Sequence, residues 1–199
     1  MSMLYNINNK KVLFIHIPKT GGSSIGTVLM PYMLNTPDIV GHQGYKECIR
    51  YYNPDYIFTV VRNPWDWRCS WYYYLKQEIA GHQFEHNNIN ILSFKEHLKW
   101  IKETPITHFT SSIYDGIISK VFIKPQSHYL NGENIKILRF ENLKTDFENY
   151  MEELGLKLKL DKHVRKSSNS NYINEYDNES IKIVEDLWIN DINNFKYNF

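Results

Sequence analysis

The distribution of hydrophobic and polar positions predicts a chain in which strands and helices alternate. Apolar runs of β-type residues occupy 11–17, 56–61 and 135–140, and the run at 56–61 is nearly continuous, as in a strand buried on both faces. Helical patterns are predicted over residues 23–33, 44–51, 64–77, 93–102, 142–154 and 178–190. This alternation indicates an α/β fold in a single domain, residues 1–199, with a mainly parallel central sheet flanked by helices.

Prolines and glycines mark the expected helix ends. Pro31 and Pro37 are expected to stop the first helix, Pro64 to begin the third, and Gly155 to cap the C-terminus of the helix at 142–154. Residues 78–90 are polar and unpatterned, which predicts a loop or lid, and residues 156–177 are basic and then rich in Ser and Asn.

Composition excludes several classes of protein. The 199 residues are 42% hydrophobic and carry a formal net charge of +1, so we expect a folded core and no nucleic-acid partner. No run approaches the roughly 20 apolar residues of a membrane span, and no signal peptide is apparent. Cys48 and Cys69 form no C-x-x-C motif, which favours a reducing, cytoplasmic location. The oligomeric state stays open.

The segment after the first apolar run has the composition of a phosphate-binding loop. Gly21 and Gly22 allow a tight turn before a helix whose first amides would face an anion. The segment also supplies one ammonium group and three hydroxyls, from Lys19, Thr20, Ser23 and Ser24. Because Lys19 precedes both glycines, the order differs from the Walker A motif of ordinary ATP-binding loops. We therefore expect a P-loop-like nucleotide-binding core with a variant loop.

A second anion site is predicted where the strand at 56–61 ends. Arg62 follows that strand, at the edge where open α/β sheets bind ligands, and Ser70 lies about two helical turns further on. Two such sites suit a ligand with phosphates at both ends. The alternatives are a structural salt bridge between Arg62 and Asp66, and a buried helix serine at Ser70.

These residues resemble the sulfotransferases that use 3′-phosphoadenosine 5′-phosphosulfate (PAPS), especially the branch related to the heparan sulfate 2-O-sulfotransferases and its bacterial relatives. The similarity is strongest over residues 11–75, in HIPKTGGSS, in the segment around His42 and in VRNPWD with its later serine. It is weaker in KPQSHYL, RFENL and the NDINNFKY ending. One departure is Trp67, where the family often has arginine, with Arg68 beside it.

The resemblance implies a role for each motif residue. Lys19 would contact the 5′-phosphate and the oxygen that bridges to sulfur, while Gly21, Gly22 and the loop hydroxyls hold the 5′ end. Arg62 and Ser70 would bind the 3′-phosphate. In this interpretation Lys166, Ser167 and Ser168 close over the 3′-phosphate.

The predicted activity is sulfuryl transfer from PAPS to an acceptor hydroxyl of a saccharide or small molecule, releasing 3′-phosphoadenosine 5′-phosphate (PAP), without a metal. His42 is the candidate base, since imidazole titrates near neutrality and the residue lies between the two anion sites. The alternatives are a kinase-like phosphotransferase and a non-catalytic module that binds adenosine bisphosphates. A zinc site is a further alternative, because His82 and His86 match H-x-x-E-H, although their setting favours a loop.

Overall fold

The computed structural model describes residues 2–34, 42–81, 92–104, 124–161 and 171–199, except for the side chains of 77–81. The chain divides into two compact units, residues 1–62 with 126–166 (unit 1) and residues 63–125 with 167–199 (unit 2). The sheet lies in unit 1, and the described regular structure of unit 2 is helical. Whether the chain unfolds as the single domain expected from the sequence stays a prediction.

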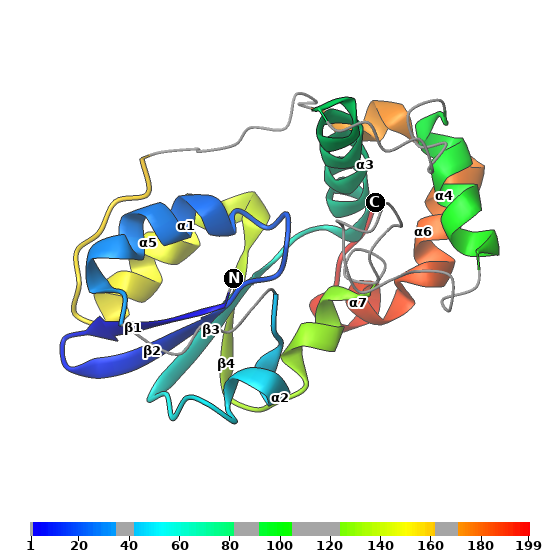
Figure 1. The fold of residues 1–199 in the computed structure, drawn as a ribbon. Helices are drawn as coiled ribbons and strands as arrows, with labels where there is room; N and C mark the ends of the chain where they lie inside the picture. Colours follow the sequence, from blue (N-terminus) through cyan, green and yellow to red (C-terminus); the bar gives the residue numbers. More distant parts are fainter. Residues whose placement is uncertain (1, 35–41, 82–91, 105–123, 162–170) are drawn as a thin grey trace. The chain divides into compact units, whose positions relative to one another are not determined.

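Unit 1 contains a four-stranded, mainly parallel sheet (Figure 1). Its strands are β1 (Met3–Ile7), β2 (Lys10–Ile15), β3 (Tyr56–Val61) and β4 (Ile135–Arg139), in that order across the sheet. β2, β3 and β4 are parallel, whereas β1 is antiparallel to β2. The predicted fold class is therefore confirmed. The three strands expected from the sequence are present, and β1 was not predicted.

β1 and β2 form a hairpin whose turn consists of Asn8 and Asn9. Both residues have positive φ, 49° and 63°, as the two central positions of a type I′ turn require. The Asn8 amide also donates to the carbonyl oxygens of Leu154 and Gly155, at 3.0 and 2.7 Å. The turn is thereby joined to the end of the last helix of unit 1.

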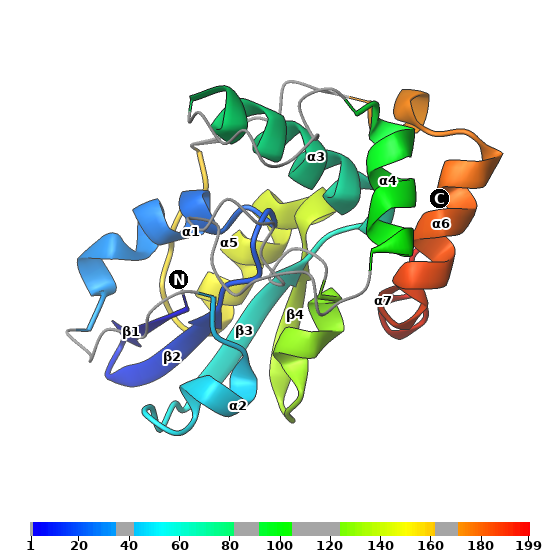
Figure 2. The ribbon, with the colours of Figure 1, turned by 45° about the vertical axis from the view of Figure 1, so that its right-hand side comes forward.

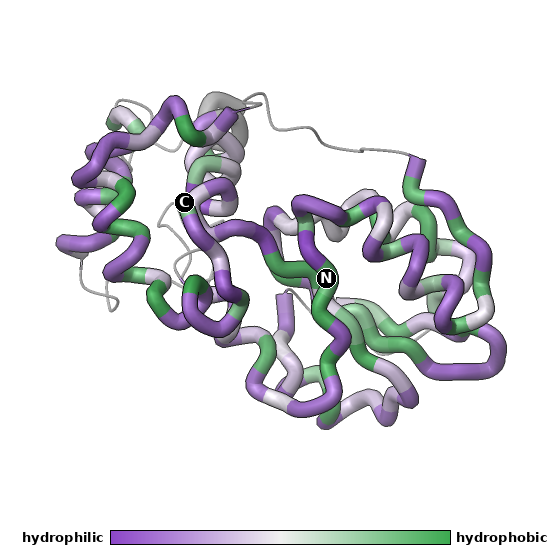
Figure 3. Tube along the Cα trace, turned by 180° about the vertical axis from the view of Figure 1, so that it is seen from behind, coloured by the Kyte–Doolittle hydropathy of each residue, from purple (hydrophilic) through white to green (hydrophobic). Residues whose placement is uncertain are grey.

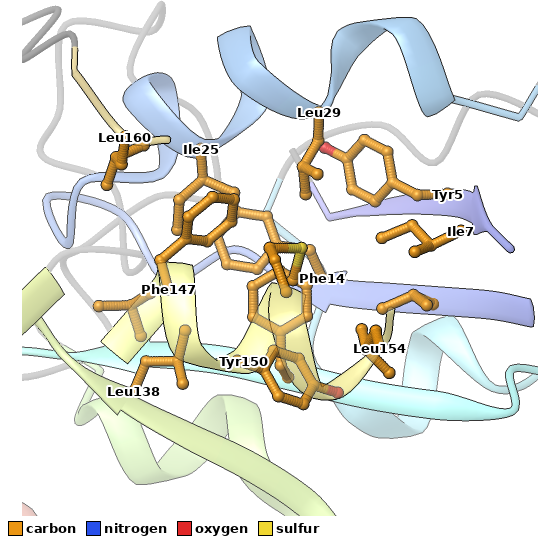
Figure 4. Packing of buried hydrophobic residues seen from close by; sticks show 14 of the residues in the cluster. Tyr5, Ile7, Phe14, Ile25, Leu29, Leu138, Phe147, Tyr150, Leu154 and Leu160 are labelled. Carbon is orange, nitrogen blue, oxygen red and sulfur yellow. The ribbon is translucent and has the colours of Figure 1, made fainter. Parts of the chain in front are cut away.

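Two helices cover one face of the sheet, and their contacts form the core of unit 1. α1 (Gly22–Leu29) and α5 (Leu143–Glu153) lie on that face, and the short α2 (Tyr45–Cys48) lies on the other (Figure 1). Ile25 of α1 and Phe147 of α5 meet above Phe14 of β2, and each is at most 1% exposed (Figure 4). Burying a side chain of this size contributes about 1.5 to 3 kcal/mol.

The helices of unit 1 are shorter than predicted. α1 ends at Leu29, and a 3₁₀ turn, Met30–Tyr32, follows with Pro31 inside it. α2 covers four residues of the predicted 44–51, Tyr45–Cys48, and hydrogen-bonded turns follow, in which the Tyr52 N–H donates to the Cys48 carbonyl oxygen at 2.9 Å. α5 ends as expected before Gly155, whose φ of 79° is the left-handed conformation of a C-terminal cap.

Unit 2 contains α3 (Pro64–Gly81), α4 (Phe94–Glu103), α6 (Asn178–Leu187) and α7 (Ile189–Phe195). α3 continues beyond the predicted residue 77, so the expected loop at 78–90 begins later, and 82–90 lie outside the described residues. The helix predicted over 178–190 ends at Leu187, and α7 was not predicted.

α4 and α6 lie side by side within unit 2 (Figure 2). Ion pairs join them, among which Lys95 contacts Glu179 at 2.6 Å and Lys102 contacts Asp186 at 3.0 Å. Both helices begin with a capping box, Ser93 with Glu96 and Asp177 with Ser180. In Figure 3, green hydrophobic stretches run through the strands of unit 1, whereas the helices of unit 2 alternate between green and purple.

Candidate functional site

The loop between β2 and α1 contains two residues with positive φ. Lys19 has φ 65° and Gly21 has φ 85°, and α1 begins at Gly22 directly afterwards. The N–H groups of Ser24 and Ile25 already donate to the Gly21 carbonyl oxygen, at 3.0 and 3.3 Å. The amides that precede them are the ones that a helix leaves without intrahelical acceptors. This geometry makes the start of α1 suitable for binding an anion.

Both loop glycines are required by their surroundings. A Cβ on Gly21 would lie 2.5 Å from Leu143 Cδ2, and its positive φ disfavours any other residue. A Cβ on Gly22 would lie 2.0 Å from His16 Nε2. The His16 ring therefore packs directly against the start of α1. No signal in the sequence separated His16 from the apolar run before it.

The three loop hydroxyls have different environments. Thr20 is fully buried, and its hydroxyl donates to the Ile17 carbonyl oxygen at 2.8 Å. This hydrogen bond holds the loop in its conformation. Ser24 is buried in the first turn of α1, and Ser23 is exposed beside it. The roles predicted for these residues as ligands stay predictions.

Arg62 lies at the carboxyl end of β3, beside the loop. It is 5% exposed, and its Nη1 donates to the Lys19 carbonyl oxygen at 3.0 Å. The guanidinium carbon lies 4.0 Å from the centre of the Phe140 ring, a cation–π contact. The Gln126 side chain accepts from the Arg62 N–H and donates to the Arg62 carbonyl, both at 2.8 Å. Gln126 and Phe140 thus fix Arg62, and sequence reasoning assigned neither of them this role.

His42 contacts His16, the residue that follows β2. Its Nδ1 is 3.2 Å from the His16 carbonyl oxygen, and the two imidazole rings meet edge to face at 4.8 Å. Because a carbonyl only accepts, Nδ1 carries the proton of the neutral ring, and the lone pair is on Nε2. Burial lowers the pKa of His42 to about 4, although the bond to His16 opposes this shift. The ring is therefore neutral near pH 7.

Unit 1 thus brings together, around the carboxyl ends of β2 and β3, one group of the predicted site residues. They are Lys19, Thr20, Gly21, Gly22, Ser23, Ser24, His42 and Arg62. Ser70 belongs to unit 2, where it is 5% exposed on α3. Lys166, Ser167 and Ser168 lie outside the described residues. A salt bridge between Arg62 and Asp66 would join the two units, so this alternative stays a prediction.

Arg68, next to the position where the resembling family often has arginine, is fully buried inside unit 2. Its guanidinium carbon lies 4.6 Å from the centre of the Trp188 ring and 5.6 Å from that of Trp67. Burial lowers the pKa of Arg68 to about 9. These contacts make Arg68 part of the packing of α3 within its unit.

The alternative zinc motif, His82 to His86, lies outside the described residues. Within the described ranges, His, Cys, Asp and Glu side chains form no group of three arranged to hold a metal ion. Over those same ranges, no helix combines the length and the apolarity that crossing a membrane requires.

No protein-family model matches the sequence, and a comparison with curated protein sequences finds no significant match. Among solved structures, the fold is similar to the mouse sulfotransferase SULT7A1 complexed with PAP. The TM-score is 0.52 at 13% sequence identity, and the similarity covers 92% of this chain and 84% of the mouse chain. At this level of identity the likeness concerns the fold. The chain therefore has the α/β fold of a sulfotransferase.

Proposed function

We propose that this chain transfers a sulfuryl group from PAPS to an acceptor hydroxyl. The observation that carries the proposal is the loop at Lys19 and Gly21, which opens α1 beside Arg62 at the ends of two parallel strands. The fold shared with a sulfotransferase solved with PAP supports it. The finer resemblance, to the branch of heparan sulfate 2-O-sulfotransferases, is part of the proposal.

In this proposal the nucleotide is held at both ends. The start of α1 and Lys19 bind the 5′-phosphosulfate, where the helix dipole and one positive charge favour an anion. Arg62 and Ser70 bind the 3′-phosphate, and Lys166 with Ser167 and Ser168 adds contacts to it. Arg62 donates to the loop through Nη1, which holds its guanidinium beside the start of α1, and a guanidinium has the geometry and charge that suit a phosphate.

The reaction needs a base and a positive charge at opposite sides of the sulfur. The acceptor oxygen attacks sulfur in line, the bond from sulfur to the bridging oxygen breaks, and PAP leaves with the electron pair. Nε2 of His42 takes the proton of the acceptor hydroxyl, which the neutral tautomer of His42 permits. The Lys19 ammonium offsets the charge that develops on the bridging oxygen.

Transfer of labelled sulfate tests this proposal. Purified protein is incubated with ³⁵S-labelled PAPS and panels of saccharides, phenols and small alcohols, and labelled product and PAP are quantified together. We expect both to form in equal amounts with one acceptor class, and to fall together in His42→Ala. Phosphoryl transfer from ATP would instead identify a kinase-like enzyme. Tight binding of PAP without turnover on any panel would identify a binding module.

A further inference from the structure

A buried hydroxyl joins the end of β2 to the segment that carries His42. Ser2 is 4% exposed, and its Oγ donates to the Gln43 carbonyl oxygen at 2.7 Å. The Ser2 Oγ also accepts a hydrogen bond from the His16 N–H at 3.1 Å. The hydroxyl thus bridges two main-chain groups, one in the residue after His42 and one in the residue that His42 contacts.

His16 makes the second connection to His42. Its carbonyl oxygen accepts the Nδ1 proton of His42 at 3.2 Å, and its ring meets the His42 ring at 4.8 Å, inclined by 70°. On its other sides the His16 ring stacks on Phe14 at 5.5 Å and lies against Gly22. The ring of His16 is therefore held between the sheet, the start of α1 and His42.

We propose that Ser2 and His16 are positioning residues that set the tautomer and the orientation of His42. Ser2 fixes the main chain at His16 and at Gln43, the two residues next to the contact between His16 and His42. His16 supplies the acceptor for the Nδ1–H of His42 and an aromatic surface for the His42 ring. Nε2 is thereby kept unprotonated. The inference rests on the proposed function only where it concerns turnover, since tautomer and orientation are properties of His42 itself.

Loss of the Ser2 hydroxyl would remove one hydrogen bond from the His16 N–H and one from the Gln43 carbonyl oxygen, which the Cys48 Sγ also approaches at 3.8 Å. Each lost hydrogen bond removes a restraint on a main-chain group beside His42, so this segment is expected to shift from its position at the end of β2. The His42 ring then loses its fixed distance to the His16 carbonyl, and the Nε2–H tautomer becomes populated. That tautomer has no lone pair on Nε2 and cannot accept a proton there.

Imidazole ¹⁵N shifts measure the tautomer directly, near pH 7 and without substrate. We expect the Nδ1–H form of His42 in the wild type and in Ser2→Thr, which keeps the hydroxyl, and a mixture of tautomers in Ser2→Ala. Thr27→Ala is the matched control, because it removes an exposed α1 hydroxyl that donates to the Ser23 carbonyl oxygen within the helix. A wild type with Nε2–H, or an Ser2→Ala spectrum equal to that of Thr27→Ala, would overturn the inference. The wild-type spectrum decides even if Ser2→Ala does not fold.

Turnover provides the second readout. We expect Ser2→Ala to lower kcat with PAPS about tenfold to a hundredfold, as for a misplaced catalytic group, with the affinity for PAP unchanged. His16→Phe keeps the carbonyl and an aromatic ring, so it should retain more turnover than His16→Ala. Equal losses in these two variants would contradict the packing role of His16. A tautomer change in a protein that transfers no sulfate would leave the positioning role standing and reject the proposed function.

Discussion

At the scale of single residues, His42 combines a defined tautomer with a low proton affinity. Its Nδ1 faces the His16 carbonyl, and burial lowers its pKa to about 4. An unperturbed histidine, with a pKa of about 6.5, is mostly protonated at pH 5 and cannot act as a base there. His42 keeps its base form under that condition. Because a pKa this low also weakens its basicity, precise placement of the ring becomes more important.

The acid limb of the activity profile follows from this shift. Since the pKa of His42 is lowered, we expect kcat/KM to hold as the pH falls through about 6.5 and to decline only at lower pH. His42→Ala should lower turnover about a hundredfold to ten-thousandfold while PAP affinity stays near wild type. A pH profile of both proteins checks this. An acid limb centred near the unperturbed value, or unchanged turnover in the variant, would remove His42 as the base.

Lys19 separates the effects of backbone strain and charge. Its φ of 65° is unfavourable for a side chain, and glycine adopts it without cost. We expect Lys19→Gly to fold with at least wild-type stability, to lose turnover strongly and to lose PAP affinity less, because the charge matters most in the transition state. Lys19→Arg, the control, keeps the charge. Thermal unfolding measures the effect of backbone strain, and kinetics with PAP titration measure the effect of the charge. Equal losses of PAP affinity and turnover would show that Lys19 only binds the nucleotide and does not stabilise the transition state.

At the scale of elements, the start of α1 offers a matched pair of substitutions. Gly22→Ala would place a Cβ 2.0 Å from His16 Nε2, so the His16 ring must move away from α1. We expect a loss of about 1 to 3 kcal/mol in the free energy of unfolding, with weaker PAP binding. Gly26→Ala, in the same helix, meets no atom within 4 Å and should gain about 0.5 to 1 kcal/mol. Denaturant unfolding of both variants tests this, and similar changes in the two would contradict the close packing at Gly22.

α4 carries a histidine whose burial makes unit 2 sensitive to acid. His97 is fully buried between Tyr72 and Trp100, and within the described residues neither ring nitrogen has a hydrogen-bond partner. Burial, and then the positive charge of Arg68, lower its pKa to about 3. The unfolded chain therefore takes up this proton first as the pH falls below about 6.5, so His97 makes stability decrease toward acid.

His97→Leu should flatten this loss of stability between about pH 6.5 and pH 4, because leucine has no proton to bind. His128→Gln, which removes an exposed imidazole, serves as the control. Denaturant unfolding at several pH values provides the measurement. An identical slope in the wild type and in His97→Leu would show that the buried ring is protonated in the folded state.

The hydrophobic pattern of the sequence predicted the strands and helices whose apolar runs or periodicity are pronounced. β3 matches its predicted bounds, because a continuous apolar run bounded by Asp55 and Arg62 has few alternatives. β1 was missed because the strand has only five residues and part of it is polar. Asn8 and Asn9, which follow it, are of a residue type that hairpin turns with positive φ favour. α7 was missed because the periodic pattern continues past Trp188, where the chain changes direction between α6 and α7.

At the scale of the whole molecule, the site depends on contacts between residues far apart in the sequence. The loop at Lys19 and Gly21 was predictable from glycine and hydroxyl chemistry close together in the chain. Ser2 and Gln126 were not, because their roles follow from partners 41 and 64 residues away. The pairing of Arg62 with Ser70 still awaits a test, since the two residues belong to different units.

Calorimetric titration with PAP, 5′-AMP and ATP is the most direct test of the central claim, that this chain binds a nucleotide with a phosphate at each end. We predict that PAP binds more tightly than 5′-AMP by about 1.5 to 3 kcal/mol, roughly tenfold to a hundredfold, because Arg62 gains a charge-assisted bond. Arg62→Ala should lose most of this preference. Equal affinities for PAP and 5′-AMP, or a clear preference for ATP with Mg²⁺, would contradict the account.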